Sequence, residues 1–300
     1  MAVNRGSACL LLREHAKRPF RGSVLELGRQ TISFNESQLR VWAEEAEVNL
    51  KSRTTASESD AGNMAGARGT IFDDDRFFHL LGFDEVASCD ASRYENSTLI
   101  VDLNQLAEQH LHGRFDVIYN GGTMEHIFHV PNVLSNIHAM LKVGGRAIHI
   151  APSSNLVDHG FYSFSPTFFC DYYEANNYDV LQISLFECFD WMTEWIVYDY
   201  SKGCLDDMWG KIATAKKIGV FCVAEKTIAS TSHVIPSQSY YSRLWQSSPK
   251  GHLSGRNALL KQALKDHFSR LTEILYWTRS LFWRTRPWRR KFMPPRMARY

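Results

Sequence analysis

Residues 115–152, FDVIYNGGTMEHIFHVPNVLSNIHAMLKVGGRAIHIAP, hold the pattern that decides the fold. Residues 115–120 form a short apolar run rich in strand-forming residues, and a glycine pair ends it. From Val130, apolar residues recur every three or four positions, which predicts an amphipathic helix with one buried face. A second glycine pair ends the helix, and residues 146–150 alternate as another strand. A strand, a crossover helix and a parallel strand make one βαβ unit of a doubly wound sheet.

Further strands are expected on both sides of this unit. They are residues 23–27, 85–91 and 99–104 before it and residues 178–185 and 218–225 after it, the last two as a hairpin pair. Ser33 and Glu36 have the spacing of a capping box, which predicts a helix from there to about Leu50. Together these elements predict an α/β fold with a seven-stranded, mostly parallel sheet and helices on both faces.

Composition narrows the class of protein. A chain of 300 residues that is 44% hydrophobic can bury a large core. No apolar run approaches the ~20 residues of a membrane span, and the run at residues 8–12 is too short for a signal peptide. Six cysteines lie far apart without a C-x-x-C pair, which favours reduced thiols and a cytoplasmic location.

Three features in order resemble the class I S-adenosylmethionine-dependent methyltransferases. They are the Phe-Asp-Val-Ile strand, the Glu125-His126-Ile127 that follows it, and the turn Leu-Lys-Val-Gly-Gly at residues 141–145, where the family usually has Leu-Lys-Pro-Gly-Gly. The resemblance covers residues 20–226. It implies a Rossmann-like sheet and S-adenosylmethionine as the cofactor.

The resemblance also implies a set of cofactor-binding residues at the ends of the first four strands. In family order these are Glu26, Gly28, Gln30, Asp90, Asp102, Leu103 and Asn120. A glycine turn lets the backbone approach the cofactor, a carboxylate such as Asp90 accepts both ribose hydroxyls, and Asp102 and Leu103 would face the adenine. Gln30 departs from the family, which has glycine there, but its amide can bond the methionine carboxylate. The alternative interpretation is that these residues only build buried strands and surface turns.

The loop after residue 120 carries candidate catalytic groups. A histidine beside a carboxylate, as in Glu125-His126, can act as a general base for an acceptor hydroxyl. Glu125, His126 and His129 together could instead ligate a metal, although we expect none, or could simply order the loop. His159, in the next loop, is an alternative base.

Residues 153–169 are expected to face the substrate. Asp158 and Tyr162 are the predicted substrate contacts, with packing of aromatic rings as the alternative. The tryptophan-rich insertion at residues 186–217 fits either a lid or a dimer contact.

The domain organisation follows from these patterns and from charge. Residues 1–22 are predicted to be a lead-in, 23–226 a methyltransferase domain with a flexible insertion at 51–70, 227–255 a linker and 256–300 a basic amphipathic helical tail. Residues 241–300 contain 14 Lys/Arg against Asp266 and Glu273, whereas the rest of the chain has 20 basic and 30 acidic residues. The tail could contact a membrane surface, bind nucleic acid or stay solvated, and the first is favoured because tryptophans cluster with the arginines.

The function expected from the sequence is methyl transfer to a small-molecule or sugar-like acceptor, with oxygen as the accepting atom and no specific nucleic-acid partner, since the body is acidic. One alternative is a catalytically inactive, methyltransferase-like binding protein. Another is a nicotinamide-dependent oxidoreductase, against which the missing G-x-G-x-x-G motif stands.

Overall fold

The computed structural model describes residues 2–51, 72–205, 215–247 and 296–299, the last group by its backbone alone. The chain divides into two units. The first contains residues 1–204, 214–236 and 294–300, and the sheets, the candidate site and every helix described below except α6 belong to it. The second contains residues 205–213 and 237–293, within which helix α6, Ser239–Ser247, is described.

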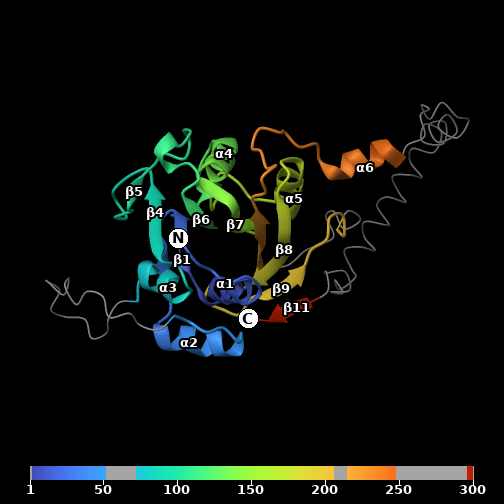
Figure 1. The fold of residues 1–300 in the computed structure, drawn as a ribbon. Helices are drawn as coiled ribbons and strands as arrows, with labels where there is room; N and C mark the ends of the chain where they lie inside the picture. The colour runs from blue at the N-terminus through green and yellow to red at the C-terminus, as the bar shows by residue number, and fades with distance from the viewer. Residues whose placement is uncertain (1, 52–71, 206–214, 248–295, 300) are drawn as a thin grey trace, which may run out of the picture. The chain divides into compact units, whose positions relative to one another are not determined.

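The first unit is built on a nine-stranded sheet in the order β11-β9-β8-β10-β7-β6-β2-β4-β5 (Figure 1). The pairs from β5 through β4, β2 and β6 to β7 are parallel, and β10 lies antiparallel between β7 and β8. The strands are β2 Ser23–Leu27, β4 Glu85–Asp90, β5 Leu99–Ile100, β6 Phe115–Gly121, β7 Leu141–Ser154, β8 Asp179–Cys188, β9 Ile196–Asp199, β10 Lys217–Glu225 and β11 Arg296–Arg299.

Helices cover both faces of the sheet, with α1, α2 and α3 on one side and α4 and α5 on the other (Figure 1). Their bounds are α1 Arg5–Lys17, α2 Glu36–Glu45, α3 Asp74–Leu80, α4 Val130–Met140 and α5 Pro166–Ala175, with short 3-10 turns η1 Gln109–Leu111 and η2 Met124–His126. The expected α/β fold is therefore confirmed. The sheet has two more strands than predicted, because β9 pairs with β8 and β11 pairs with β9.

The N-terminal residues are part of the core, whereas the sequence analysis left residues 1–22 as a lead-in. Helix α1 begins after Asn4, whose side chain and that of Ser7 cap each other's backbone N–H. Leu10, Leu11 and Leu12 are at most 2% exposed. Strand β1, Ala2–Val3, pairs in parallel with β3, Thr31–Ile32, as a separate two-stranded sheet. The sequence analysis did not recognise the apolar face of α1, because basic residues flank its apolar run in the sequence.

The first helix after β2 is capped differently from the prediction. Its N-cap is Asn35, which forms a reciprocal capping box with Gln38, and the helix ends at Glu45. Ser33 instead donates its backbone N–H and its hydroxyl to the carbonyl of Val3. The predicted box at Ser33 and Glu36 was wrong, because Ser33 is used to hold the N-terminal strand.

Other boundaries also shifted. The glycine pair 144–145 lies within β7 rather than before it, and its backbone bonds Lys226. The expected strand at residues 99–104 has only two residues. Helix α6 falls within the predicted linker, and β11 is a strand within the predicted helical tail. The insertion at 51–70 and most of the basic tail lie outside the described residues. In the described part of the chain, no helix has the length and apolar character needed to cross a membrane.

Packing of α1 against Trp195 gives a prediction about Gly6. A Cβ built on Gly6 would lie 2.0 Å from Cδ2 of Trp195, which is 1% exposed and stacks on Phe186 at 4.0 Å. Glycine to alanine normally stabilises a helix, but here overpacking should reverse the sign and cost roughly 1–3 kcal/mol. The free energy of unfolding from urea denaturation measures this for Gly6→Ala, with the exposed Glu44→Ala as control. A stabilised Gly6→Ala would contradict the packing.

Candidate functional site

The turn after β2 lies at the centre of the sheet's carboxyl edge. Leu27, the last residue of β2, is paired with Cys89 of β4 on one side and with Asn120 of β6 on the other. Gly28 follows with φ +70°, a conformation that favours glycine, and its N–H donates to the carbonyl of Cys89 at 2.8 Å. The predicted residues around Gly28, at the end of β4 and at the end of β6 are thus brought together, since parallel strands end at the same edge.

Two buried oxygens at this turn have no hydrogen-bond partner. They are Oε1 of Glu26 and Oε1 of Gln30. The other carboxylate oxygen of Glu26 accepts the backbone N–H of Gln30 at 3.2 Å, and the Gln30 amide donates to the carbonyl of Gly28 at 3.0 Å. Burial, followed by the nearby charge of Asp74, raises the pKa of Glu26 to about 9. The carboxyl of Glu26 is therefore neutral and can donate its proton to the neighbouring carboxylate of Asp74, whereas the amide oxygen of Gln30 has no donor.

Arg29 has a role that the sequence analysis did not assign. Its guanidinium forms two hydrogen bonds, of 2.9 and 3.1 Å, with the carboxylate of Asp74 in the first turn of α3. Asp74 is 5% exposed, whereas the Arg29 side chain is 35% exposed, so only the carboxylate is shielded from water. This contact fixes α3 against the glycine turn. The sequence held only one indication of this contact, an acidic residue at the start of the helix. Acidic residues are common in the first turn of helices, so this indication does not identify a partner.

Asp90 and Asp102 lie where the resemblance places them, at the ends of β4 and beyond β5. The Asp90 carboxylate accepts from the backbone N–H and the hydroxyl of Ser92 at 2.9 and 3.2 Å. The exposed Asp102 accepts from the backbone and side chain of Asn104. Leu103 is 4% exposed and packs inward. Each aspartate uses one oxygen locally, which leaves the other oxygen available to a ligand.

The side chain of Asn120 orders the next loop. Its Oδ1 accepts the backbone N–H groups of Thr123 and Met124, both at 3.0 Å, and its amide nitrogen lies 3.3 Å from Nδ1 of His149. Thr123 in turn donates its hydroxyl to the carbonyl of Leu27. Asn120 is fully buried. Since both lone pairs of its oxygen are used, it positions η2 and the Glu125 within it.

Two loops meet at Glu125, 34 residues before His159. The carbonyl of Glu125 accepts the N–H groups of Phe161 and Tyr162 at 2.8 and 3.2 Å. A Cβ at Gly160 would lie 2.8 Å from that carbonyl, so glycine permits the approach. The contact sets Nε2 of His159 3.6 Å from Oε1 of Glu125. The Glu125 carboxylate is 1% exposed and burial raises its pKa to about 7, while its Oε2 is buried without a partner.

His126 joins this pair and His129 does not. The rings of His126 and His159 have centroids 5.0 Å apart, and burial, then the neighbouring His159, lowers the pKa of His126. Ligand atoms of Glu125, His126 and His159 all lie within 4.8 Å of one another. His129 instead precedes α4 as its N-cap residue and packs its ring against Phe128. The metal alternative built on His129 was therefore wrong in its third residue.

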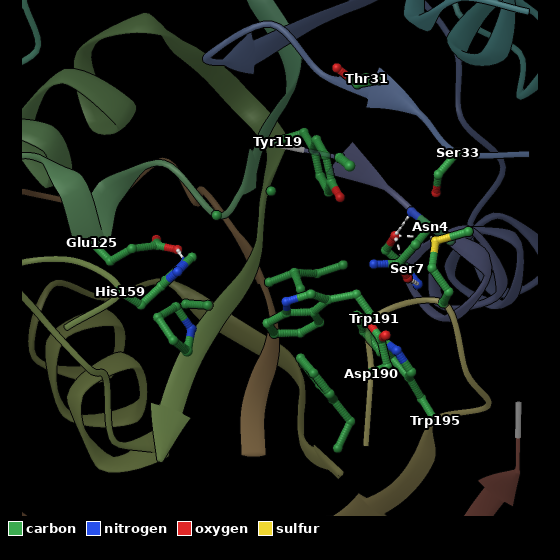
Figure 2. A pocket seen from close by; sticks show the side chains of 18 residues that line it. Asn4, Ser7, Thr31, Ser33, Tyr119, Glu125, His159, Asp190, Trp191 and Trp195 are labelled. Atoms are coloured by element: carbon green, nitrogen blue, oxygen red, sulfur yellow. Dashed lines mark hydrogen bonds and ion pairs between the residues drawn. The ribbon is translucent and has the colours of Figure 1, made fainter. Parts of the chain in front are cut away.

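A cavity of about 460 Å³ opens beside Glu125 and His159 (Figure 2). Gly121, Gly122 and the end of β7 form one wall, and the N-terminal segment forms another. Aromatic rings line much of the remainder, and no Lys or Arg is among the lining residues. The full lining consists of Ala2, Asn4, Ser7, Thr31, Ser33, Tyr119, Gly121, Gly122, Glu125, Ile150, Ala151, Pro152, His159, Phe186, Asp190, Trp191, Met192 and Trp195. The sequence analysis missed the N-terminal wall, because it placed that segment outside the domain.

The two predicted substrate contacts lie outside this lining. Asp158 is exposed with φ +67°. Tyr162 donates its hydroxyl to the carbonyl of Phe128 at 2.8 Å and packs against Phe164. Both residues belong to the loop that presents His159. Their part in substrate binding stays a prediction, with a visible structural role for Tyr162.

The strand order defines the class of fold. Numbered along the chain as one to seven, strands β2, β4, β5, β6, β7, β8 and β10 lie side by side as three-two-one-four-five-seven-six, with the seventh antiparallel. This is the Rossmann-like sheet of the class I methyltransferases.

Solved structures with this fold resemble the chain at low identity. One is a 1,6-didemethyltoxoflavin N1-methyltransferase from Burkholderia thailandensis, with TM-score 0.36, 13% identity and coverage of 73% of this chain and 76% of that chain. Another is a methyltransferase from Archaeoglobus fulgidus, described as dependent on S-adenosylmethionine, with TM-score 0.38, 12% identity and coverage of 74% and 96%. No family model and no curated protein matches the sequence. Similarity this low transfers no activity to the chain.

The buried Glu26 predicts an unusual pH dependence of stability. In the unfolded chain its pKa returns to about 4.5, so between that value and about 9 folding must take up a proton. The free energy of unfolding contributed by this group is therefore lost as pH rises through that window. Glu26→Gln should remove this pH dependence. The free energy of unfolding of the variant relative to the wild type should therefore be higher at about pH 8 than at about pH 5.5. Urea denaturation at both pH values tests this, with the exposed Glu44→Gln as control. Equal pH slopes in wild type and Glu26→Gln would show that Glu26 is ionised when folded.

Proposed function

We propose that the protein is an S-adenosylmethionine-dependent methyltransferase that methylates an oxygen atom of a small acceptor without negative charge. The observation that supports the proposal is the turn at Gly28, where two buried oxygens lack donors and where sheets of this strand order generally bind ligands. Buried polar groups are seldom left unpaired without a reason. An ammonium group such as that of the cofactor's methionine part is a matching donor for Glu26 and Gln30.

The residues at this edge fit the cofactor in other respects. Gly28 leaves the backbone open, and the free oxygen of Asp90 suits a ribose hydroxyl. Oε1 of Gln30 lies 2.8 Å from where a Cβ on Gly121 would be, so the unpaired amide oxygen packs against a residue that lines the cavity. Asp102 and Leu103 remain the proposed adenine contacts. When bound, the cofactor would supply an electrophilic methyl group.

The cavity supports the proposed acceptor class. Its volume of about 460 Å³ is in the range of small-molecule sites. Because no Lys or Arg lines it, it offers nothing to neutralise a phosphate or carboxylate. Hydroxyl and amide groups from the N-terminal wall can bond a hydroxylated molecule, and Trp191 offers a flat apolar surface. A nucleic-acid substrate does not suit such a lining.

Chemistry on oxygen requires removal of a proton from the acceptor. Glu125 and His159 line the cavity and His126 adjoins them, so these three remain the proposed catalytic residues. Positioning of the acceptor in line with the methyl group supplies most of the remaining acceleration. Asn120 contributes indirectly, because it holds η2 and therefore Glu125 in place.

Calorimetric titration with S-adenosylmethionine and S-adenosylhomocysteine tests the proposal. The wild type should bind both, and Asp90→Ala should lose about tenfold or more in affinity, since a charge-assisted hydrogen bond is worth about 1.5–3 kcal/mol. Asp179→Ala, at the exposed start of β8, is the matched control and should bind as the wild type does. Absence of binding to the wild type would favour the alternative of an inactive, methyltransferase-like binding protein.

A further inference from the structure

We infer that Glu125, His126 and His159 form a binding site for a divalent transition-metal cation at the mouth of the cavity. The binding itself requires no methyl donor and so stands apart from the proposed function. Only its catalytic consequence rests on that function. The sequence analysis expected no metal, and its metal alternative had His129 as the third ligand. Here the third ligand is His159, which lies 34 residues after Glu125 in another loop.

The spacing of the donor atoms fits a shared cation. Zinc binds histidine nitrogen and carboxylate oxygen at about 2.0–2.2 Å, so neighbouring ligands of a tetrahedral site lie about 3.4 Å apart. Oε1 of Glu125 and Nε2 of His159 are 3.6 Å apart. All three ligand atoms lie within 4.8 Å of one another. His126 is exposed, so tight packing does not prevent its side chain from adjusting toward the other two ligands.

A second observation points to a ligand. Oε2 of Glu125 is buried and has no hydrogen-bond partner, although the side chain is only 1% exposed. Leaving a buried carboxylate oxygen unpaired costs free energy that the fold must offset. The distance to His159 is too long for a hydrogen bond, so the histidine does not satisfy the carboxylate. A cation bound by both carboxylate oxygens and by the two imidazoles would pair Oε2 as well as Oε1.

The ligand types indicate which metals fit. Two imidazoles and one carboxylate suit zinc and similar first-row cations, whereas calcium and magnesium prefer oxygen ligands alone. Three protein ligands leave a coordination position open, as in catalytic rather than structural zinc sites. Glu125 and His159 both line the cavity, so the open position faces the acceptor. The neighbouring Gly160 allows the close approach of the two loops that assembles the set.

A cation here would specify how the acceptor is activated, if the proposed methyl transfer is correct. Zinc lowers the pKa of bound water to about 7 and would favour ionisation of a bound acceptor hydroxyl in the same way. The acceptor's O–H bond would break and its proton would pass to water. The oxygen would keep the electron pair and form a bond to the methyl carbon, while the methyl donor's S–CH3 bond breaks and leaves S-adenosylhomocysteine. The imidazoles then act as ligands rather than as bases, and no oxidant or reductant is needed.

The test is titration of the chelator-treated full chain with zinc chloride, followed calorimetrically, and with cobalt(II), followed by its visible absorption bands. We expect one cation bound per chain with tetrahedral or five-coordinate cobalt bands. Glu125→Gln and His159→Ala should weaken binding by more than the about 10–100-fold that loss of an outer-sphere partner costs. His129→Ala, which changes a nearby histidine outside the cluster, should bind as the wild type does.

Each outcome decides the inference. No binding by the wild type, or binding that Glu125→Gln and His159→Ala leave unchanged while circular dichroism shows them folded, would overturn it. Asp90→Ala separates the two proposals, because it should bind zinc normally while losing affinity for the methyl donor. A chain that binds zinc but no methyl donor would keep the metal site and reject the methyltransferase.

Discussion

The position of Leu27 between two parallel neighbours determines how the carboxyl edge is arranged. Its register with Cys89 on one side and Asn120 on the other brings three strand ends to the same level. The backbone N–H of Gly28 donates to β4, and the hydroxyl of Thr123 donates to the carbonyl of Leu27, so both bonds fix the loops that follow. A slip of one residue in either pairing would exchange the faces of every side chain on that strand. The candidate site therefore depends on this central register.

The site also concentrates polar groups that the fold leaves unpaired. Oxygens of Glu26, Gln30 and Glu125 are all buried without partners, and all three residues adjoin the same edge of the sheet. Such groups lower the stability of the free protein. Proteins accept this cost where a ligand completes the bonding, so stability and function are opposed at these positions. Most of the core is apolar, although it also buries polar atoms of other residues, among them Ser97 Oγ and Trp195 Nε1.

Segments far apart in the chain complete the cavity. Strand β1 pairs with β3, and α1 then lies against one face of the sheet. Gly6 leaves room there for Trp195 to stack on Phe186. Trp195 belongs to the aromatic insertion at residues 186–217, for which the sequence analysis gave two alternatives, a lid and a dimer contact. In the structure this residue is core and also lines the cavity. The insertion thus joins the wall of the site to the hydrophobic core of the unit.

The sequence by itself predicted the central elements of the sheet, because the spacing of apolar residues in β6, α4 and β2 follows from the directions in which successive side chains point on a strand or a helix. It also marked Glu125 and His159 as candidates, each within its own loop. Only the tertiary structure decided that they meet, and that His126 rather than His129 joins them. The physical reason is that the two loops are joined through the backbone carbonyl of Glu125. Every residue has a backbone carbonyl, so the sequence does not show which one is used. Contacts of that kind have no signature in residue type.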